Sequence, residues 1–230
     1  MTCLHTTSDY TFVAETPDMH ESPDISAFIT QEILRPSKQW IINILNGKQE
    51  QEEVRFRNKD FVLLPDTERV NRYPSQSLNS TRPYKRVLNW LAIAQDTGLH
   101  TLRDLRGRHT ETLRAMHAIC TQLIQNETGI RSDQIMAYVH YPPSVYQLHV
   151  HFSFPYGQYC HRDTYRVHSL QSIINNLQID PEYYAKATLQ IPVHRQSLHY
   201  AALSESRKKQ GDEGDATRPP NWDKTIDQTH

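Results

Sequence analysis

The stretch "AYVHYPPSVYQLHVHFSF" (residues 137–154) consists of two apolar runs on either side of a proline pair. Both runs are rich in β-branched and aromatic residues, which favour strands, and two consecutive prolines interrupt any regular element. Residues 134–141 and 146–154 therefore predict two strands joined by a turn. We expect them to pair as an antiparallel hairpin.

Three histidines distinguish this hairpin from an ordinary pair of core strands. Successive side chains of a strand point to opposite faces, so His149 and His151 share one face and lie about 7 Å apart. The opposite face carries the apolar side chains of the core: Leu148, Val150, Phe152 and Phe154. His140 approaches the histidine face if the strands pair. The sequence thus predicts three imidazoles and the amide of Gln147 on a polar face outside the core.

The remaining pattern predicts a mixture of helices and strands. Helical periodicity with proline or glycine at the ends marks five segments. They are 24–34, 38–46, 83–98, 110–126 and 165–178. Short apolar runs at 52–57, 60–65 and 187–193 predict further strands. Because helices and strands do not alternate strictly, we expect an α+β fold, with an antiparallel sheet and flanking helices.

The two ends of the chain differ in composition from the region between them. Residues 1–23 are polar and of mixed charge, and residues 204–230 have almost no apolar content. We expect a loosely ordered N-terminal segment, a folded domain over 24–203 and a disordered polar tail.

Overall composition excludes several classes of protein. The 230 residues carry a net charge of −1, which argues against a broad surface for long nucleic acid or for an acidic membrane. The three cysteines show no paired spacing and fit a reducing compartment. No secretory signal and no run near the ~20 apolar residues of a membrane span is present. We expect a soluble, cytoplasmic protein, with the nucleus as an alternative.

Three explanations compete for the histidines. The simplest is a solvated polar face without chemistry. A His-x-His pair can also bind zinc, but the only acids within 131–168 are Asp133 and Asp163. The third is phosphate chemistry, because neutral imidazole can carry a phosphoryl group and neighbouring imidazoles can stabilise and protonate the leaving group.

The segment "YVHYPPSVYQLHVHF" resembles the histidine-triad family, whose motif is His-φ-His-φ-His-φ-φ with φ apolar. More narrowly, it resembles the scavenger messenger-RNA decapping enzymes. The resemblance runs in order from about 38 to 189. It includes "QWIINILNGKQEQEEVRF", "DFVLLPD", "GLHTLRDL" and "YRVHSLQSIINNLQIDPEYY". It implies a histidine-triad domain that forms a homodimer.

The resemblance implies a hydrolase that needs no metal or cofactor. Its substrate would be a cap dinucleotide or short capped RNA, cut at the 5′–5′ triphosphate to release 7-methylguanosine monophosphate. His149 would be the nucleophile of a covalent histidine–nucleotide intermediate. The groups implied to contact the phosphates are His140, His151, Ser144, Arg166 and Gln147.

Cap recognition by the family implies four further residues. Trp40 would stack on the cationic methylated guanine and Glu50 would pair with the edge of the base. Pro65 and Asp66 would lie near the same base. Read without the family, Trp40 is more simply a core residue of helix 38–46, and Glu50 a solvated charge.

The sequence departs from the family pattern in several places. Gln147 replaces the leading histidine of the triad, and Glu68 stands where the family has a lysine. Loop 67–82 is longer, Val145 stands where the family often has tyrosine, and the family's separate N-terminal domain has no counterpart before residue 38. These departures leave two alternatives to a cap hydrolase: a less selective nucleotide hydrolase or transferase of histidine-triad type, and a catalytically weak cap-binding regulator.

Overall fold

A computed structural model describes residues 9–66, 88–154 and 165–209. The chain divides into two compact units, one of residues 32–185 and one formed by both ends of the chain, up to residue 31 and from residue 186. The central unit contains the hairpin with the histidines.

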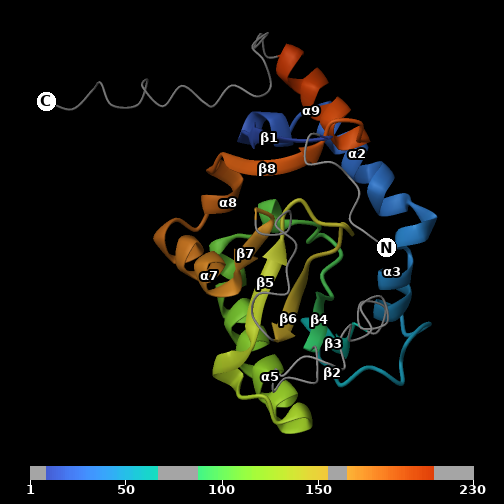
Figure 1. Ribbon diagram of the computed structural model, residues 1–230, viewed down its shortest axis with the longest axis vertical. Coiled ribbons are helices and arrows are strands. Elements are labelled where there is room, and N and C mark those ends of the chain that lie inside the picture. The colour runs from blue at the N-terminus through green and yellow to red at the C-terminus, as the bar shows by residue number, and fades with distance from the viewer. Residues whose placement is uncertain (1–8, 67–87, 155–164, 210–230) are drawn as a thin grey trace, which may run out of the picture. The chain divides into compact units, whose positions relative to one another are not determined.

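A six-stranded antiparallel sheet forms the centre of this unit, in the order β2-β3-β4-β6-β5-β7 (Figure 1). The strands are β2 (Phe56–Arg57), β3 (Phe61–Pro65), β4 (Leu88–Ala94), β5 (Met136–His140), β6 (His149–Phe154) and β7 (Val167–Ser169). The predicted α+β class with an antiparallel sheet is confirmed. The predicted pairing of the two hairpin strands is also confirmed, since β5 and β6 pair with Tyr138 opposite His151.

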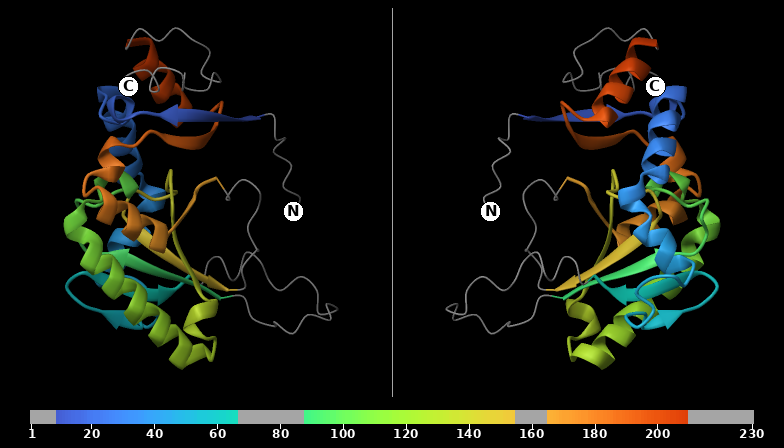
Figure 2. Two further views of the ribbon diagram at one scale, coloured as in Figure 1. Left: turned by 90° about the vertical axis from the view of Figure 1, so that its left-hand side faces the viewer. Right: turned by 90° about the vertical axis from the view of Figure 1, so that its right-hand side faces the viewer.

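Two longer helices pack together beside β5 (Figure 2). They are α5 (Thr110–Thr128) and α7 (Leu170–Ile179). The buried positions of α5 include Leu113, Met116, Cys120 and Ile124, the helical spacing that the sequence predicts. Gly129 ends α5 with φ of 73°, a left-handed conformation that glycine adopts without steric cost. The segment predicted as one helix from 165 begins with β7, and its helix starts only at Leu170.

A short helix, α3 (Trp40–Leu45), covers the same face of the sheet that carries the histidines. Its buried side chains join one hydrophobic cluster, formed by Ile41, Ile44, Val62, Leu64, Leu91, Ile93 and Val145. Leu91 lies opposite His151 and Ile93 opposite His149 across the β4–β6 ladder. Directly opposite residues share a face, so α3 and the histidines lie on the same side of the sheet.

The helix predicted over 83–98 is wrong, because Leu88–Ala94 is the central strand β4. All seven of its residues are buried, since β4 pairs with a strand on each edge and both of its faces are covered. A strand buried on both faces shows no alternation, and its periodicity cannot be told from that of a buried helix. Pro83, at the start of the predicted helix, lies outside the described residues.

The second unit joins the two ends of the chain through an antiparallel pair. β1 (Tyr10–Glu15) pairs with β8 (Leu189–His194), with Val13 opposite Ile191. The helices at the ends are α1 (Pro17–His20), α2 (Pro23–Leu34) and α9 (Leu198–Lys209). Regular structure therefore extends outside the predicted 24–203 on both sides, to Tyr10 and to Lys209. The strand predicted over 187–193 is confirmed as β8, whereas its pairing with a segment so far away in the chain has no local signal.

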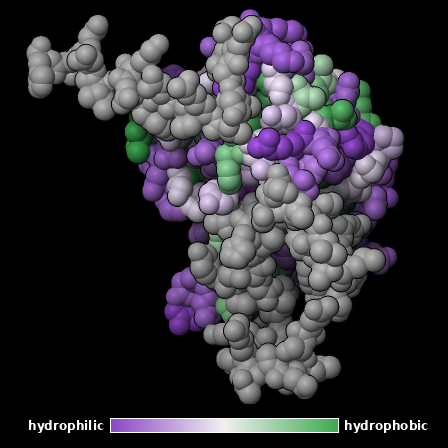
Figure 3. Space-filling model, turned by 45° about the horizontal axis from the view of Figure 1, so that its top comes forward, coloured by the Kyte–Doolittle hydropathy of each residue, from purple (hydrophilic) through white to green (hydrophobic). Residues whose placement is uncertain are grey.

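The remaining elements are short connections. They are the 3-10 turns η2 (Pro36–Lys38), η3 (Leu102–Asp104), η4 (Gly107–His109) and η5 (Ser132–Gln134), and helix α8 (Tyr183–Lys186). Thr101 and Asp104 cap η3 reciprocally. None of the described helices has both the length and the apolar character needed to cross a membrane. On the face drawn in Figure 3, polar side chains of the described residues surround scattered apolar ones.

Candidate active site

The three histidines lie buried on the two strands of the predicted hairpin. His149 and His151 lie on β6 and are 7% and 3% exposed, and His140 ends β5 and is 3% exposed. The prediction that they lie on a polar face outside the core is wrong, because β6 is a central strand and its histidine face adjoins the cluster under α3. Buried imidazoles need specific partners, so a solvated polar face without chemistry does not explain these histidines.

The ring of His149 is held in one tautomer. Its Nδ1 lies 2.7 Å from the backbone oxygen of Gln147. A carbonyl oxygen only accepts hydrogen bonds, so Nδ1 carries the hydrogen, and in the neutral ring Nε2 carries the lone pair. A neutral imidazole oriented by its other nitrogen is the form required of a nucleophile or base.

His140 and His151 form a direct ring-to-ring hydrogen bond. Nδ1 of His140 lies 3.2 Å from Nε2 of His151, so one nitrogen donates and the other accepts. The ring of His151 is 4.6 Å from that of His140 and 5.0 Å from that of His149, between centroids. Tyr138 stacks on His151 at 5.0 Å with an interplanar angle of 12°. The structure therefore brings the three predicted histidines into one cluster, and sequence reasoning missed the tyrosine that packs against it.

Arg166 supports the turn between the two histidine strands. Its Nε and Nη2 donate to the backbone oxygen of Pro142 at 3.0 and 2.6 Å. The backbone N–H of Tyr141 donates to the oxygen of Arg166 at 2.8 Å. The arginine precedes β7 rather than opening a helix, and its fork holds the turn adjacent to His140. Ser144, in the same turn, is exposed.

A buried arginine that the sequence analysis passed over lies beneath this turn. Arg103 is 3% exposed, and its Nε donates to the hydroxyl of Tyr141 at 3.3 Å. Its Nη1 donates to the backbone oxygen of Tyr184 at 3.1 Å, and its guanidinium lies 5.7 Å from the centroid of the Tyr141 ring. Burial, with a smaller contribution from Arg103, lowers the pKa of the neighbouring His168. A single arginine in a connecting segment gives no sequence signal of such a role.

Gln147 takes a positioning role in place of the phosphate contact expected of it. Its Nε2 donates to the backbone oxygens of Ala94 at 2.8 Å and Asp96 at 3.0 Å. Both donors of the amide are thus used, and the remaining carbonyl oxygen would repel a phosphate oxygen. The amide instead ties the end of β4 to the start of the histidine strand.

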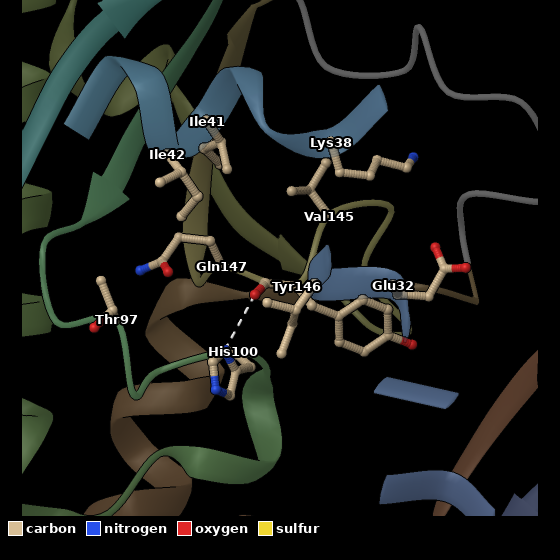
Figure 4. Close-up of a pocket in the computed structure, with 10 residues that line it drawn as sticks. Glu32, Lys38, Ile41, Ile42, Thr97, His100, Val145, Tyr146 and Gln147 are labelled. Atoms are coloured by element: carbon tan, nitrogen blue, oxygen red, sulfur yellow. Dashed lines mark hydrogen bonds between the residues drawn. The ribbon is translucent and has the colours of Figure 1, made fainter. Parts of the chain in front are cut away.

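A cavity of about 90 Å³ is lined in part by Gln147 (Figure 4). Lys38, Ile41 and Ile42 contribute to its wall from η2 and α3. His100 also lines it, and its Nδ1 lies 3.2 Å from the backbone oxygen of Tyr146. The three clustered histidines do not line this cavity, so it is separate from them.

The residues expected to recognise the base are divided between a helix and a turn. Trp40 is the first residue of α3, half-buried, and packs against the cluster under that helix. Glu50 lies in the following turn with φ of 53°, a left-handed conformation that is strained for a side chain of this kind. Such strain is concentrated at functional sites. The core-packing explanation of Trp40 and the stacking explanation are both compatible with a half-buried ring.

Asp66 is anchored to the same face as the histidines. Its backbone N–H donates to the oxygen of Asn89, and its Oδ2 accepts from Nδ2 of Asn89, both at 2.8 Å. Asn89 lies opposite Ser153, two residues beyond His151 on β6. Pro65, the last residue of β3, lies opposite Trp90. Asn89 was missed because it lies on the strand mistaken for a helix. Glu68 and loop 67–82 lie outside the described residues.

Metal ligation gains no support from the part of the chain that the structure describes. Within it, no three His, Cys, Asp or Glu side chains are arranged to hold a metal ion. Cys120 lies in α5, and burial raises the pKa of its thiol far above the usual value, so the described cysteine is not a ready thiolate ligand. Cys160 lies outside the described residues.

Adjoining buried imidazoles on the two strands of an antiparallel hairpin define the class: an α+β protein with a buried histidine cluster on its central sheet. The family model described as "Scavenger mRNA decapping enzyme C-term binding" matches residues 39–160, more than half of the chain. The chain therefore belongs to the scavenger mRNA decapping enzyme family.

Curated relatives agree with this assignment. A protein of Bos taurus named m7GpppX diphosphatase is 32% identical over 176 residues, which cover 75% of this chain and 49% of the relative. A protein of the same name from Caenorhabditis elegans is 32% identical over 184 residues, 77% of this chain and 54% of the relative. The chain thus spans about half the length of the curated relatives it matches.

Comparison with solved structures finds a remote likeness. The aprataxin ortholog Hnt3 from Schizosaccharomyces pombe is 12% identical, with a TM-score of 0.35 over 78% of this chain and 97% of that one.

Proposed function

We propose that the protein hydrolyses a 7-methylguanosine cap dinucleotide or short capped RNA and releases 7-methylguanosine monophosphate. The observation that carries this proposal is the tautomer of His149, whose Nε2 lone pair lies in a cluster with two further imidazoles. Membership of the decapping family and the relatives named m7GpppX diphosphatase support the substrate class.

In the first step, the Nε2 lone pair of His149 attacks the phosphorus nearest the methylated guanosine. A nitrogen–phosphorus bond forms as the bond from that phosphorus to the bridging oxygen breaks. The leaving phosphate takes the electron pair, and a neighbouring imidazole that starts in its protonated form, His151 or His140, supplies the proton and becomes neutral. Buried donors stabilise the growing negative charge more strongly than water-exposed ones would.

In the second step, water attacks the same phosphorus and the nitrogen–phosphorus bond breaks. The imidazole that gave up its proton accepts one from the water, so both histidine side chains return to their starting state. Arg166 contributes by fixing the turn after His140, and its planar, charged guanidinium suits phosphate oxygens.

Recognition of the methylated base is assigned to the α3 side of the site. Trp40 offers an aromatic face to the cationic ring and Glu50 a carboxylate to its N–H edge, while Asp66 is oriented by Asn89. Pro65 precedes it at the end of β3.

Product analysis tests the function. The protein is incubated separately with methylated cap dinucleotide, unmethylated cap dinucleotide and diadenosine polyphosphate. Release of 7-methylguanosine monophosphate from the methylated compound alone is expected. Cleavage of all three would establish the less selective hydrolase. Val145 favours this alternative, because it is buried in the core cluster and is not a residue that would contact a phosphate. Tight binding without turnover would establish the regulator, which Gln147 in the leading triad position favours.

We further propose a homodimer that acts in the cytoplasm on short capped RNA. Light scattering at micromolar concentration measures the oligomeric state directly. A homodimer has twice the mass of the 26.9 kDa chain. Fractionation of cells measures the localisation. A monomeric mass or an exclusively nuclear protein would overturn the respective statement.

A further inference from the structure

Arg57 lies on β2, at the end of the hairpin with β3, and reaches the C-terminus of α3. Its Nη2 donates to the backbone oxygen of Ile44 at 2.9 Å and its Nη1 to that of Leu45 at 3.0 Å. The last carbonyl oxygens of a helix have no partner within the helix and carry partial negative charge. The guanidinium supplies both the hydrogen bonds and the opposite charge, so it fixes the helix that begins with Trp40.

The same guanidinium also holds the turn that contains Glu50. It lies within 3.3 Å of Oε1 of Gln51, the residue after Glu50, and within 3.4 Å of Oε1 of Gln95. Gln51 in turn donates from Nε2 to the backbone oxygens of Ile44 at 3.2 Å and Gln49 at 2.6 Å. One planar cation therefore links three segments: the end of α3, the turn around Glu50 and the end of β4.

The turn needs such support. Glu50 has φ of 53°, which a glutamate adopts only when its surroundings enforce it. The hydrogen bonds of Gln51 hold the backbone directly after Glu50, and Arg57 holds Gln51. Loss of Arg57 releases the turn without removing any group expected to contact a ligand.

We propose that Arg57 is a positioning residue that sets the separation between Trp40 and Glu50, and thereby the selectivity for methylated guanine. This inference rests on the proposed function of the site. A cationic base must meet an aromatic face and a carboxylate at once, and both lie on the segments that Arg57 links. The histidine cluster lies on β5 and β6 and makes no contact with Arg57 among its hydrogen bonds described above.

The test compares Arg57→Gln, Arg57→Lys and Arg114→Gln with the unaltered protein. Arg57→Gln removes the fork, and Arg57→Lys keeps the charge but cannot span two carbonyls and two amides. Arg114 is an exposed arginine of α5 that pairs with Glu111, so its variant controls for loss of charge. KM and kcat are measured on methylated and unmethylated cap dinucleotides.

Arg57→Gln is expected to raise KM for the methylated compound about tenfold, the size of a lost charge-assisted hydrogen bond, while kcat stays within about twofold. The preference for the methylated compound falls by a similar factor, Arg57→Lys recovers part of it, and Arg114→Gln changes neither. A role limited to stability would instead lower kcat through the active fraction and leave KM and the preference unchanged, which would overturn the inference.

A second variant guards against misfolding of the first. Gln51→Ala removes the amide between Arg57 and the turn without changing any charge, and it should move KM in the same direction by a smaller factor. If the unaltered protein cleaves the methylated compound selectively and both variants are equally selective, the positioning role of Arg57 is refuted. The proposed function would still stand. An unaltered protein without methyl selectivity would refute both.

Discussion

The two halves of the candidate site are built in different ways. The histidine cluster lies on central strands, with all three imidazoles buried and bonded to one another or to backbone. The base-recognition half lies on the first residue of a short helix, on a strained turn and on the residue after a strand. Central strands fix atoms more rigidly than turns. The difference suggests that the chemistry is preorganised by the sheet, whereas selectivity depends on supports such as Arg57 and Asn89.

The largest expected effect separates chemistry from binding. His149→Asn keeps a polar side chain on β6 but removes the nucleophilic nitrogen, so turnover should fall by at least about a thousandfold. Affinity for a methylated cap analogue should stay within about threefold, because the base is held from the α3 side. Calorimetric titration alongside single-turnover assays measures both. Retained turnover would show that His149 is not the nucleophile. The chemistry could then not be assigned to the histidine half of the site.

The next effect probes the support beneath the histidine half. Arg103→Gln leaves the hydroxyl of Tyr141 and the oxygen of Tyr184 without their buried cation. Unfolding free energy should fall by about 3 kcal/mol, as for other broken buried charge networks. Urea denaturation measures this loss. Exposed Arg131, paired with Asp133 on the surface, provides the control, since Arg131→Gln should leave the unfolding free energy close to that of the unaltered protein. Equal losses of unfolding free energy in the two variants would mean that the buried hydrogen bonds of Arg103 stabilise the fold no more than an exposed ion pair does.

Elements of the fold that have local signals in the sequence could be predicted, and elements that depend on distant contacts could not. The hairpin of β5 and β6 has alternating apolar residues and a proline turn, which are local signals, so its strands and the shared face of His149 and His151 could be predicted. The β2–β3 hairpin and helices α2, α3 and α5 were predicted for the same reason. β4 was not, because a strand buried on both faces has no periodicity of its own.

Some partners of the site residues were not predicted because they lie on β4, the strand that was predicted as a helix. Asn89 orients Asp66, and Ala94 accepts the hydrogen bond of Gln147, and both lie on β4. Tyr138 lies on the predicted hairpin itself, two residues before His140 and on the same face, so strand alternation could have indicated it. Arg103 acts through contacts with Tyr141 and Tyr184, segments distant in the chain, which no local pattern encodes. The pairing of β1 with β8 is likewise non-local. Residue types at the site could therefore be inferred, whereas the supports that orient them required the fold.

A smaller effect sharpens the contrast on the base-recognition side. Glu50→Gly removes both the carboxylate and the steric strain of a left-handed φ. Cap affinity should fall about tenfold, while unfolding free energy should rise by about 0.5 kcal/mol, because glycine adopts this conformation freely. Glu50→Gln keeps the strain and should weaken binding without stabilising the fold. A destabilised Glu50→Gly variant would show that the turn is not strained.

The smallest effect concerns acid sensitivity of the histidine half. Burial and Arg103 lower the pKa of His168 in the folded protein below its usual value. Between that lowered pKa and about 6.5, the unfolded chain binds more protons than the folded one, so folding stability decreases as the pH falls through this window. Above it, His168 is neutral in both states and has no effect on the slope. His168→Gln should flatten the dependence of the urea midpoint on pH between 5 and 6.5, because the lowered pKa of this imidazole no longer contributes. An unchanged slope would assign the acid sensitivity to other groups, such as His117, whose pKa burial also lowers.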